Sequence, residues 1–298
     1  DITGLEFKPD LVWIKCRSET QNNDLYDSIR GGSARLIPNS DSGESSYSNL
    51  IQSFDEDGVT LGTAQEMNKN SETYVAWCWK AGGAAVSNTD GNITSSVSAN
   101  QEAGFSIVTY TGNGTSPQTV GHGLGKAPAV VIVKDRDNSM DWVVKHQDLS
   151  SNKILYLQSS SAEDTGTGSN NGIIDNLTSA TTTTVTLTNN GSGNMNMVNK
   201  SSTDYVMYCW AEIPGFSKFG TYRGTGNSNG AFVHLGFRPA WLMTKRINSS
   251  RNWIIFDNKR DTDNVATKIL EADQTSSDAD INGGLDFLSD GFKIVTSD

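Results

Sequence analysis

The chain has 298 residues, of which 35% are hydrophobic, and its formal net charge at pH 7 is −11. The acidic balance predicts that nucleic acid is not a partner, because a polyanion would be repelled. The sequence contains no run of about 18 apolar residues, so no membrane insertion is predicted. The modest apolar content suits several small domains better than one large one, because small domains have more surface per residue.

A short apolar run that begins with proline and ends with lysine occurs three times, at Pro9–Lys15, Pro128–Lys134 and Pro239–Lys245. We call these runs the marker strands, because their β-branched and aromatic residues predict strands. Their prolines lie 119 and 111 residues apart, which is the spacing of domains and too long for a solenoid unit. Tandem copies of one small module are typical of an extended structural or binding protein.

The first repeat, residues 1–80, continues with a hairpin at Asp57 and Gly58. These residue types tolerate the positive φ that tight turns require. A closing strand is predicted at Tyr74–Trp79, which reads Tyr-Val-Ala-Trp-Cys-Trp. Only eight residues precede Pro9, so the first repeat lacks an opening strand.

The second repeat, residues 104–214, contains every motif. It has an opening strand at Gly104–Gly112 and a closing strand at Tyr205–Trp210. Residues Thr184–Leu187 match the strand after the Asp-Gly hairpin more weakly. Residues 81–103 are poor in large apolar side chains and rich in Gly, Ser, Asn and Thr. This composition predicts a linker between the first and second repeats.

The third repeat, residues 215–298, opens at Gly215–Gly224 with one inserted residue and reaches its hairpin at Asp290 and Gly291, but no closing strand follows. Residues 262–270 read either as a helix or as a loop followed by a strand. Two explanations fit the incomplete outer repeats. We expect the chain to be a piece of a longer polypeptide; alternatively, neighbouring copies or subunits supply the missing strands.

With about six or seven strands per repeat, the fold class is predicted to be all-β, with tandem antiparallel β-sandwich (jelly-roll-like) domains in three related copies. The first and last copies are incomplete. Cys78 and Cys209 occupy the same slot of the closing strand, where we expect small buried side chains and no disulfide. Unpaired cysteines indicate folding in a reducing cytoplasm.

No residue pattern indicates catalysis. His122 and His234 precede two of the marker prolines, where we expect a structural hydrogen bond at a strand entrance. Asp55–Gly58 and Asp278–Gly283 favour hairpins over calcium loops, because the full EF-hand spacing is missing. Walker loops, nucleophile elbows and zinc-binding motifs are also missing. The sequence therefore predicts no catalytic residues, no cofactor-binding residues, no metal ligands, no cofactor and no enzyme.

Several sequence segments resemble a β-rich domain that recurs in virion and tail-fibre proteins of marine tailed bacteriophages. The family of this domain is uncharacterised. The resemblance extends over all three repeats. The family has no defined catalytic residues, so none are carried over. The matching phrases are Leu11–Lys15, Tyr26–Gly31, Phe54–Val59, Thr73–Gly82, Gly104–Gly112, Gly121–Gly125 with Ala127–Pro128, and Gly236–Trp241.

The resemblance implies a bacteriophage virion structural protein. We expect a tail-fibre segment that acts as an adhesin in host attachment, made in the host cytoplasm and located in the extracellular virion. The expected partners are other copies of the chain in a homotrimer, other virion proteins and host surface glycan, contacted by loops such as Ser159–Asn176. The alternatives are a head-decoration or neck protein of the same particle, and a depolymerase of surface glycan.

Overall fold

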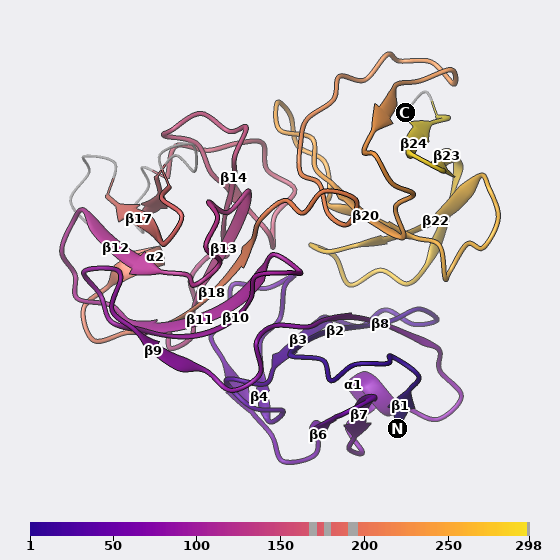
Figure 1. Cartoon of the computed structure of the whole chain (residues 1–298). Coiled ribbons are helices and arrows are strands. Elements are labelled where there is room, and N and C mark those ends of the chain that lie inside the picture. Colours follow the sequence, from indigo (N-terminus) through magenta and orange to yellow (C-terminus); the bar gives the residue numbers. More distant parts are fainter. Residues whose placement is uncertain (167–171, 176–179, 190–195, 297–298) are drawn as a thin grey trace.

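The computed structural model describes residues 1–166, 172–175, 180–189 and 196–296. Its regular elements are strands in antiparallel sheets, with two four-residue helices, so the predicted all-β class is confirmed. The marker runs form β2 (Leu11–Cys16), β13 (Val130–Asp135) and β20 (Trp241–Thr244), one in each repeat (Figure 1). β2 and β13 each lie between two strands, whereas β20 lies at the edge of its sheet.

The first repeat forms two three-stranded sheets that face each other, with strand orders β3-β2-β8 and β1-β7-β6, and a two-stranded sheet, β4-β5. Val12, Ile14 and Tyr26 from one sheet pack against Val59 from the other. The hairpin predicted at Asp57 and Gly58 joins β6 to β7. The elements are β1 (Ile2–Thr3), β2 (Leu11–Cys16), β3 (Asn23–Asp27), β4 (Ala34–Arg35), β5 (Ser45–Ser46), β6 (Ile51–Asp55), β7 (Gly58–Leu61), α1 (Gln65–Asn68) and β8 (Tyr74–Trp79).

The second repeat forms a sandwich of a seven-stranded sheet, β15-β14-β13-β18-β11-β10-β9, and a three-stranded sheet, β12-β17-β16. Val131, Tyr110 and Val185 lie in the core between the two sheets. The elements are β9 (Val86–Asn88), β10 (Ser95–Asn100), β11 (Phe105–Thr111), β12 (Gln118–Gly121), β13 (Val130–Asp135), β14 (Val143–His146), β15 (Leu155–Tyr156), β16 (Ile173–Ile174), β17 (Thr184–Thr188), α2 (Asn196–Asn199) and β18 (Asp204–Trp210).

The segment 81–103 corrects a sequence prediction, because it contains two strands where a linker is predicted. All six residues of β10 pair with β11, and β9 extends the same sheet. Val97 and Ile93 are buried in the core of the second sandwich. The serines of β10 form strand pairs as readily as larger residues, because backbone hydrogen bonds and a few apolar anchors suffice. Composition alone therefore misleads here.

The third repeat forms one six-stranded sheet, β19-β24-β23-β22-β21-β20, around Phe256, Leu285, Phe287 and Phe292. Residues 262–270, which were ambiguous in the sequence, form a loop followed by β22. The opening segment, Gly215–Gly224, does not form the strand that its likeness to β11 predicts. The strands are β19 (Phe232–His234), β20 (Trp241–Thr244), β21 (Ile254–Asp257), β22 (Ala266–Glu271), β23 (Ala279–Leu288) and β24 (Gly291–Ile294).

The three repeats are not arranged in a row, because their sheets pack around one apolar core (Figure 1). Along β2, Val12 and Ile14 face the core of the first repeat, whereas Leu11 and Trp13 face this shared core. We call it the central core. Its larger buried side chains are Leu11, Trp13, Leu25, Leu36 and Trp77 from the first repeat, Phe105, Ile107, Ile132, Trp142, Val144, Leu149, Leu155, Leu157, Val206 and Tyr208 from the second, and Trp253, Ile255 and Leu270 from the third.

Candidate functional site

Trp79, the last residue of β8, lies where the three repeats meet. Its ring makes edge contacts with Trp210 of the second repeat and Trp241 of the third, with ring centroids 6.4 and 5.8 Å apart. Edge-to-face aromatic pairs contribute about 0.5–1.5 kcal/mol beyond the burial of their surface. One indole from each repeat therefore joins the three groups of sheets.

Equivalent side-chain N–H groups of the three repeats donate hydrogen bonds to backbone carbonyls of neighbouring repeats. Each donor lies at, or directly before, the start of the strand that follows the marker strand. Each acceptor directly follows a leucine (Leu36, Leu155 or Leu270) that pairs with that strand in the neighbouring repeat. Such bonds satisfy polar groups that the packing would otherwise bury unpaired. The three bonds are Trp142 Nε1 to Ile37 O at 3.1 Å, Trp253 Nε1 to Tyr156 O at 2.9 Å and Asn23 Nδ2 to Glu271 O at 3.1 Å.

A buried ion pair joins the first and second repeats. Oδ2 of Asp27 accepts hydrogen bonds from Arg30 Nε at 2.6 Å and from the Tyr208 hydroxyl at 2.7 Å. Burial opposes the charge on Arg30, but Asp27 and Glu44 outweigh it and raise the pKa of the guanidinium. Burial raises the pKa of Tyr208 well above its ordinary value. The tyrosine is therefore a neutral donor to the carboxyl group of Asp27.

The same arrangement joins the first and third repeats. Oδ2 of Asp257 accepts hydrogen bonds from Arg260 Nε at 2.6 Å and from Trp77 Nε1 at 3.1 Å. The Arg260 guanidinium lies 5.8 Å from the centroid of the Trp77 ring. Burial favours the neutral form of Asp257, but Arg260 outweighs it and lowers the pKa of the carboxyl. Trp77 and Tyr208 hold the same position in the two closing strands.

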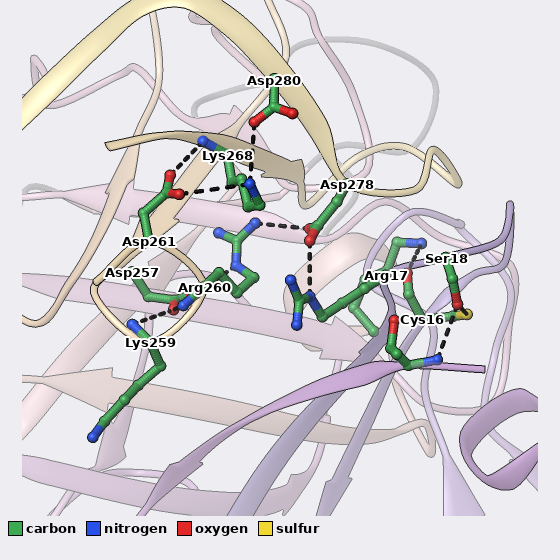
Figure 2. Close-up of polar contacts among 12 residues, drawn as sticks. Cys16, Arg17, Ser18, Asp257, Lys259, Arg260, Asp261, Lys268, Asp278 and Asp280 are labelled. Atoms are coloured by element: carbon green, nitrogen blue, oxygen red, sulfur yellow. Dashed lines mark hydrogen bonds and ion pairs between the residues drawn. The ribbon is translucent and has the colours of Figure 1, made fainter. Parts of the chain in front are cut away.

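Asp278 extends this network, as Figure 2 shows. Its carboxylate accepts from Arg17 Nε of the first repeat at 2.8 Å and from Arg260 Nη1 at 3.0 Å. Asp280, two residues on, forms an ion pair with Lys268 at 3.4 Å. Residues 279–283 belong to β23, so the hairpin predicted at Asp278–Gly283 is corrected to a strand. Only the contact between Asp278 and Arg17 crosses between repeats, so Asp278 is the bridging residue of this segment.

The lysines that close the marker strands bind backbone carbonyls. Lys15 Nζ donates to Thr275 O of the third repeat at 3.2 Å, and Lys245 Nζ donates to Ser160 O of the second at 3.1 Å. Lys134 is fully buried, and its Nζ donates to Asp135 O at 2.6 Å. Burial lowers the pKa of Lys134 to about 8. The lysines at the ends of the marker strands thus hold loops within and between repeats.

The histidines have different environments. His122 is buried; its Nε2 lies 3.3 Å from Thr181 O and its Nδ1 accepts from the Leu124 amide. Burial lowers the pKa of His122, so its ring is neutral near pH 7. These contacts are those of the predicted structural histidine at a strand entrance. His234 is instead exposed, with its Nδ1 3.4 Å from Asp290 Oδ2.

A polar depression of about 400 Å³ opens on the second repeat. It lies over β9, β10, β11 and β18, beside the salt bridge at 2.8 Å between Arg136 and Glu44 of the first repeat. Thr111 Oγ1 donates to Asp204 Oδ1 at 2.7 Å on its wall. Hydroxyl, guanidinium and carboxylate groups suit a hydroxylated ligand such as a sugar. The lining residues are Ser87, Thr94, Ser95, Ser96, Thr109, Tyr110, Thr111, Arg136 and Asp204.

Sequence reasoning missed both buried Asp–Arg pairs and the polar depression. A signal for the pairs was present, because Asp27 and Arg30 recur with the same spacing as Asp257 and Arg260. In the part of the chain that the structure describes, no group of three or more His, Cys, Asp or Glu residues could hold a metal ion. The loop predicted to contact the host, Ser159–Asn176, lies partly outside the described residues, at 167–171 and 176.

These features define an all-β protein in which antiparallel sheets from three repeats enclose one central core and one repeat carries a polar depression. The chain belongs to the family described as Domain of unknown function (DUF7483), whose model matches residues 1–298. No curated protein and no solved structure matches the chain. Within the described ranges, no helix is long and apolar enough to cross a membrane.

Proposed function

We propose that this protein is a structural segment of a bacteriophage virion, located in a tail fibre that contacts the host surface. The resemblance of its marker, opening and closing strands to phage virion domains supports the assignment. Several copies per particle, arranged as trimers, would multiply weak contacts by raising the effective concentration of binding sites.

The observation that carries this proposal is that two buried Asp–Arg pairs connect neighbouring repeats. Arg30 and Asp27, and Arg260 and Asp257, connect neighbouring repeats through Tyr208 and Trp77. A large apolar interface reinforced by buried hydrogen bonds restricts motion between domains. Such a unit suits a protein whose task is to hold a shape under load.

Host contact is assigned to the polar depression on the second repeat. Ser96 and Thr109 face each other as a cross-strand pair of β10 and β11, and both are partly exposed. Their hydroxyl groups, with the nearby carboxylate of Asp204, can exchange hydrogen bonds with the hydroxyl groups of a surface glycan. Weak binding at this site in each chain would suffice in a multivalent fibre.

The location is tested by labelling intact phage with an antibody against this chain and imaging the particle. Label along the tail fibre is the expected result. Label on the capsid or neck would contradict the proposal and favour the head-decoration or neck alternative.

The contact is tested by measuring the binding of purified host-surface glycan to the full chain. Thr109→Val removes one hydroxyl of the depression and should weaken binding several-fold. Thr188→Val removes a partly exposed strand hydroxyl elsewhere and should leave binding unchanged. Equal effects of the two variants would reject the depression as the binding site. Shortening of the glycan by the purified protein would instead establish a depolymerase.

A further inference from the structure

The edge of β20 differs from the equivalent edges of the other marker strands. β2 lies between β3 and β8, and β13 lies between β14 and β18, whereas β20 pairs only with β21 among the described strands. All six residues of β2 are buried, but all four residues of β20 are partly exposed. An unpaired edge presents a row of free backbone N–H and C=O groups.

A side chain beside this edge also lacks a hydrogen-bond partner. The indole Nε1 of Trp241, the first residue of β20, is buried and makes no hydrogen bond. A buried N–H group without an acceptor destabilises the fold, because it has lost its hydrogen bond to water and gained none in the protein. Among the described residues, the third repeat therefore lacks two things at β20: the second neighbouring strand that β2 and β13 have and, at Trp241, a hydrogen-bond acceptor for a buried N–H group.

The opening segment of the third repeat, Gly215–Gly224, pairs with no described strand; its backbone pairing is a single bridge between Ser217 and Ile213. Its equivalent, β11, pairs along its whole length with the closing strand β18. In that pair, Phe105 packs on Trp210 and Tyr110 stacks on Tyr205, with centroids 5.0 and 5.2 Å apart. The residue equivalent to Phe105 is Phe216, which is 63% exposed rather than 2%. The segment thus contains the equivalent of the phenylalanine that β11 packs against its closing strand, but no closing strand in the described part of the chain covers Phe216.

The second anchor is Tyr222, the counterpart of Tyr110. Tyr222 is 43% exposed and Tyr110 is 5% exposed. The ring of Tyr222 makes an edge contact with Phe292, at 6.0 Å, which strand pairing would replace. If the segment paired as a strand, its extra residue would form a bulge at Gly220, because a glycine tolerates the backbone that a bulge requires.

The segment is already held close to the second repeat at Ser217, which bridges to Ile213, and at Phe219. Gln147 Nε2 donates to Phe219 O at 2.9 Å, and the Phe219 amide donates to Glu212 Oε1 at 3.0 Å. Figure 1 shows the chain beyond this point as a long orange loop that leads to β19. The segment Gly215–Gly224 and the β20 edge therefore correspond to β11 and β13, the two strands that flank the closing strand β18 in the second repeat.

We propose that the third repeat is an acceptor for one β-strand of a partner chain, bound between the edge of β20 and the segment Gly215–Gly224. The strand runs antiparallel to β20 and carries the pattern Tyr-Val-x-aromatic-Cys-Trp, which β8 and β18 share. Main-chain hydrogen bonds give affinity in this mode of binding, and side-chain pockets give specificity.

The pattern follows from the register of the second repeat. Tyr205 pairs with Tyr110, and Trp210 pairs with Phe105 and with Val130 of the marker strand. Carried to the third repeat, the tyrosine of the bound strand meets Tyr222 and its tryptophan lies between Phe216 and Trp241. The fourth residue, which is Tyr208 or Trp77 in the complete strands, points toward the second repeat at His146, the position equivalent to Asp27 and Asp257.

The probe for the test is a fluorescently labelled peptide with the sequence of residues 203–211, which contains β18. Fluorescence anisotropy measures its binding to the full chain under reducing conditions, with a scrambled peptide as the control. We expect saturable binding of the native peptide and none of the scrambled one. Failure of the native peptide to bind would overturn the proposal.

Two matched variants locate the binding site. Phe216→Ser and Phe232→Ser each remove an exposed phenylalanine, so neither should unfold the chain. Phe216→Ser should weaken peptide binding roughly tenfold or more, because aromatic anchors dominate such interfaces. Phe232→Ser, in β19 outside the acceptor, should have no effect. Binding that is insensitive to Phe216→Ser would contradict the proposed position.

Discussion

Tyr208 in the second repeat donates its hydroxyl to Oδ2 of Asp27 in the first repeat, 2.7 Å away. Trp77 makes the corresponding bond from the first repeat to Asp257 in the third. In both cases an aromatic residue of a closing strand reaches a carboxylate already paired with arginine. The closing strands therefore complete their own sheets and also connect one repeat to the next.

Tyr208→Phe should lower the free energy of unfolding by about 1–3 kcal/mol, because a buried hydrogen bond to a charged group is lost while the ring packing is kept. Chemical denaturation of the full chain measures the change. Tyr47→Phe is the control, because Tyr47 is 52% exposed, and it should change stability by less than about 0.5 kcal/mol. Equal stability of the two variants would show that the Tyr208 hydroxyl contributes nothing.

Asp278→Asn should lower the free energy of unfolding by about 1–3 kcal/mol, because Arg17 and Arg260 both lose a charged acceptor. Asp280→Asn, two residues further along the chain, is the matched control. The side chain of Asp280 is 70% exposed, and surface ion pairs contribute about 0–1 kcal/mol. Thermal or denaturant unfolding of both variants decides the comparison, and a larger loss for Asp280→Asn would refute the bridging role of Asp278 (Figure 2).

Lys134 should make stability depend on pH above about 8. Its folded pKa of about 8 lies below its usual 10.5, so between these values the unfolded chain holds a proton that the folded chain has released. Stability contributed by this group therefore rises with pH through that window, by at most about 1.4 kcal/mol per pH unit.

Lys134→Met removes the titrating group and keeps an apolar side chain of similar length. Denaturant unfolding of the wild type and the variant at pH 7 and pH 9.5 gives two stability differences. The free energy of unfolding of the wild type, relative to that of Lys134→Met, should be greater at pH 9.5 than at pH 7. A difference that does not change with pH would show that the pKa of Lys134 is not lowered by folding.

Trp79→Ala should lower the free energy of unfolding by about 2–3 kcal/mol, somewhat less than for a fully buried tryptophan. The loss arises because contacts to Trp210 and Trp241 in two other repeats disappear together. Phe232→Ala, which removes an exposed aromatic ring, is the control and should have little effect. Similar stability of these two variants would argue against Trp79 as a residue that joins the repeats.

The sequence predicted the strands and hairpins well where the signal is local. The Asp-Gly turn at Asp57 and Gly58 and the alternating Val59 and Leu61 specify this hairpin without information from distant parts of the chain. The segment 81–103 was harder, because β10 is built of small residues and gains its order by pairing with β11. Its strand character depends on a neighbour that composition does not reveal.

The central core could not be predicted from periodicity. Alternation shows that one face of β2 is buried, but Leu11 and Trp13 on the other face are buried only because another repeat covers them. The partner of Asp278 is Arg17, 261 residues away, and no motif links the two. The marker lysines recur visibly in the sequence, yet the carbonyl groups that Lys15 and Lys245 reach in other repeats, at Thr275 and Ser160, lie in loops with no common sequence.

The most direct test of the central claim, that the three repeats form one unit around a shared core, is differential scanning calorimetry of the full chain. The account predicts one transition in which the calorimetric and van't Hoff enthalpies agree, because unfolding any repeat exposes the central core. Separate transitions for individual repeats, with one of them unaffected by Trp79→Ala, would contradict it.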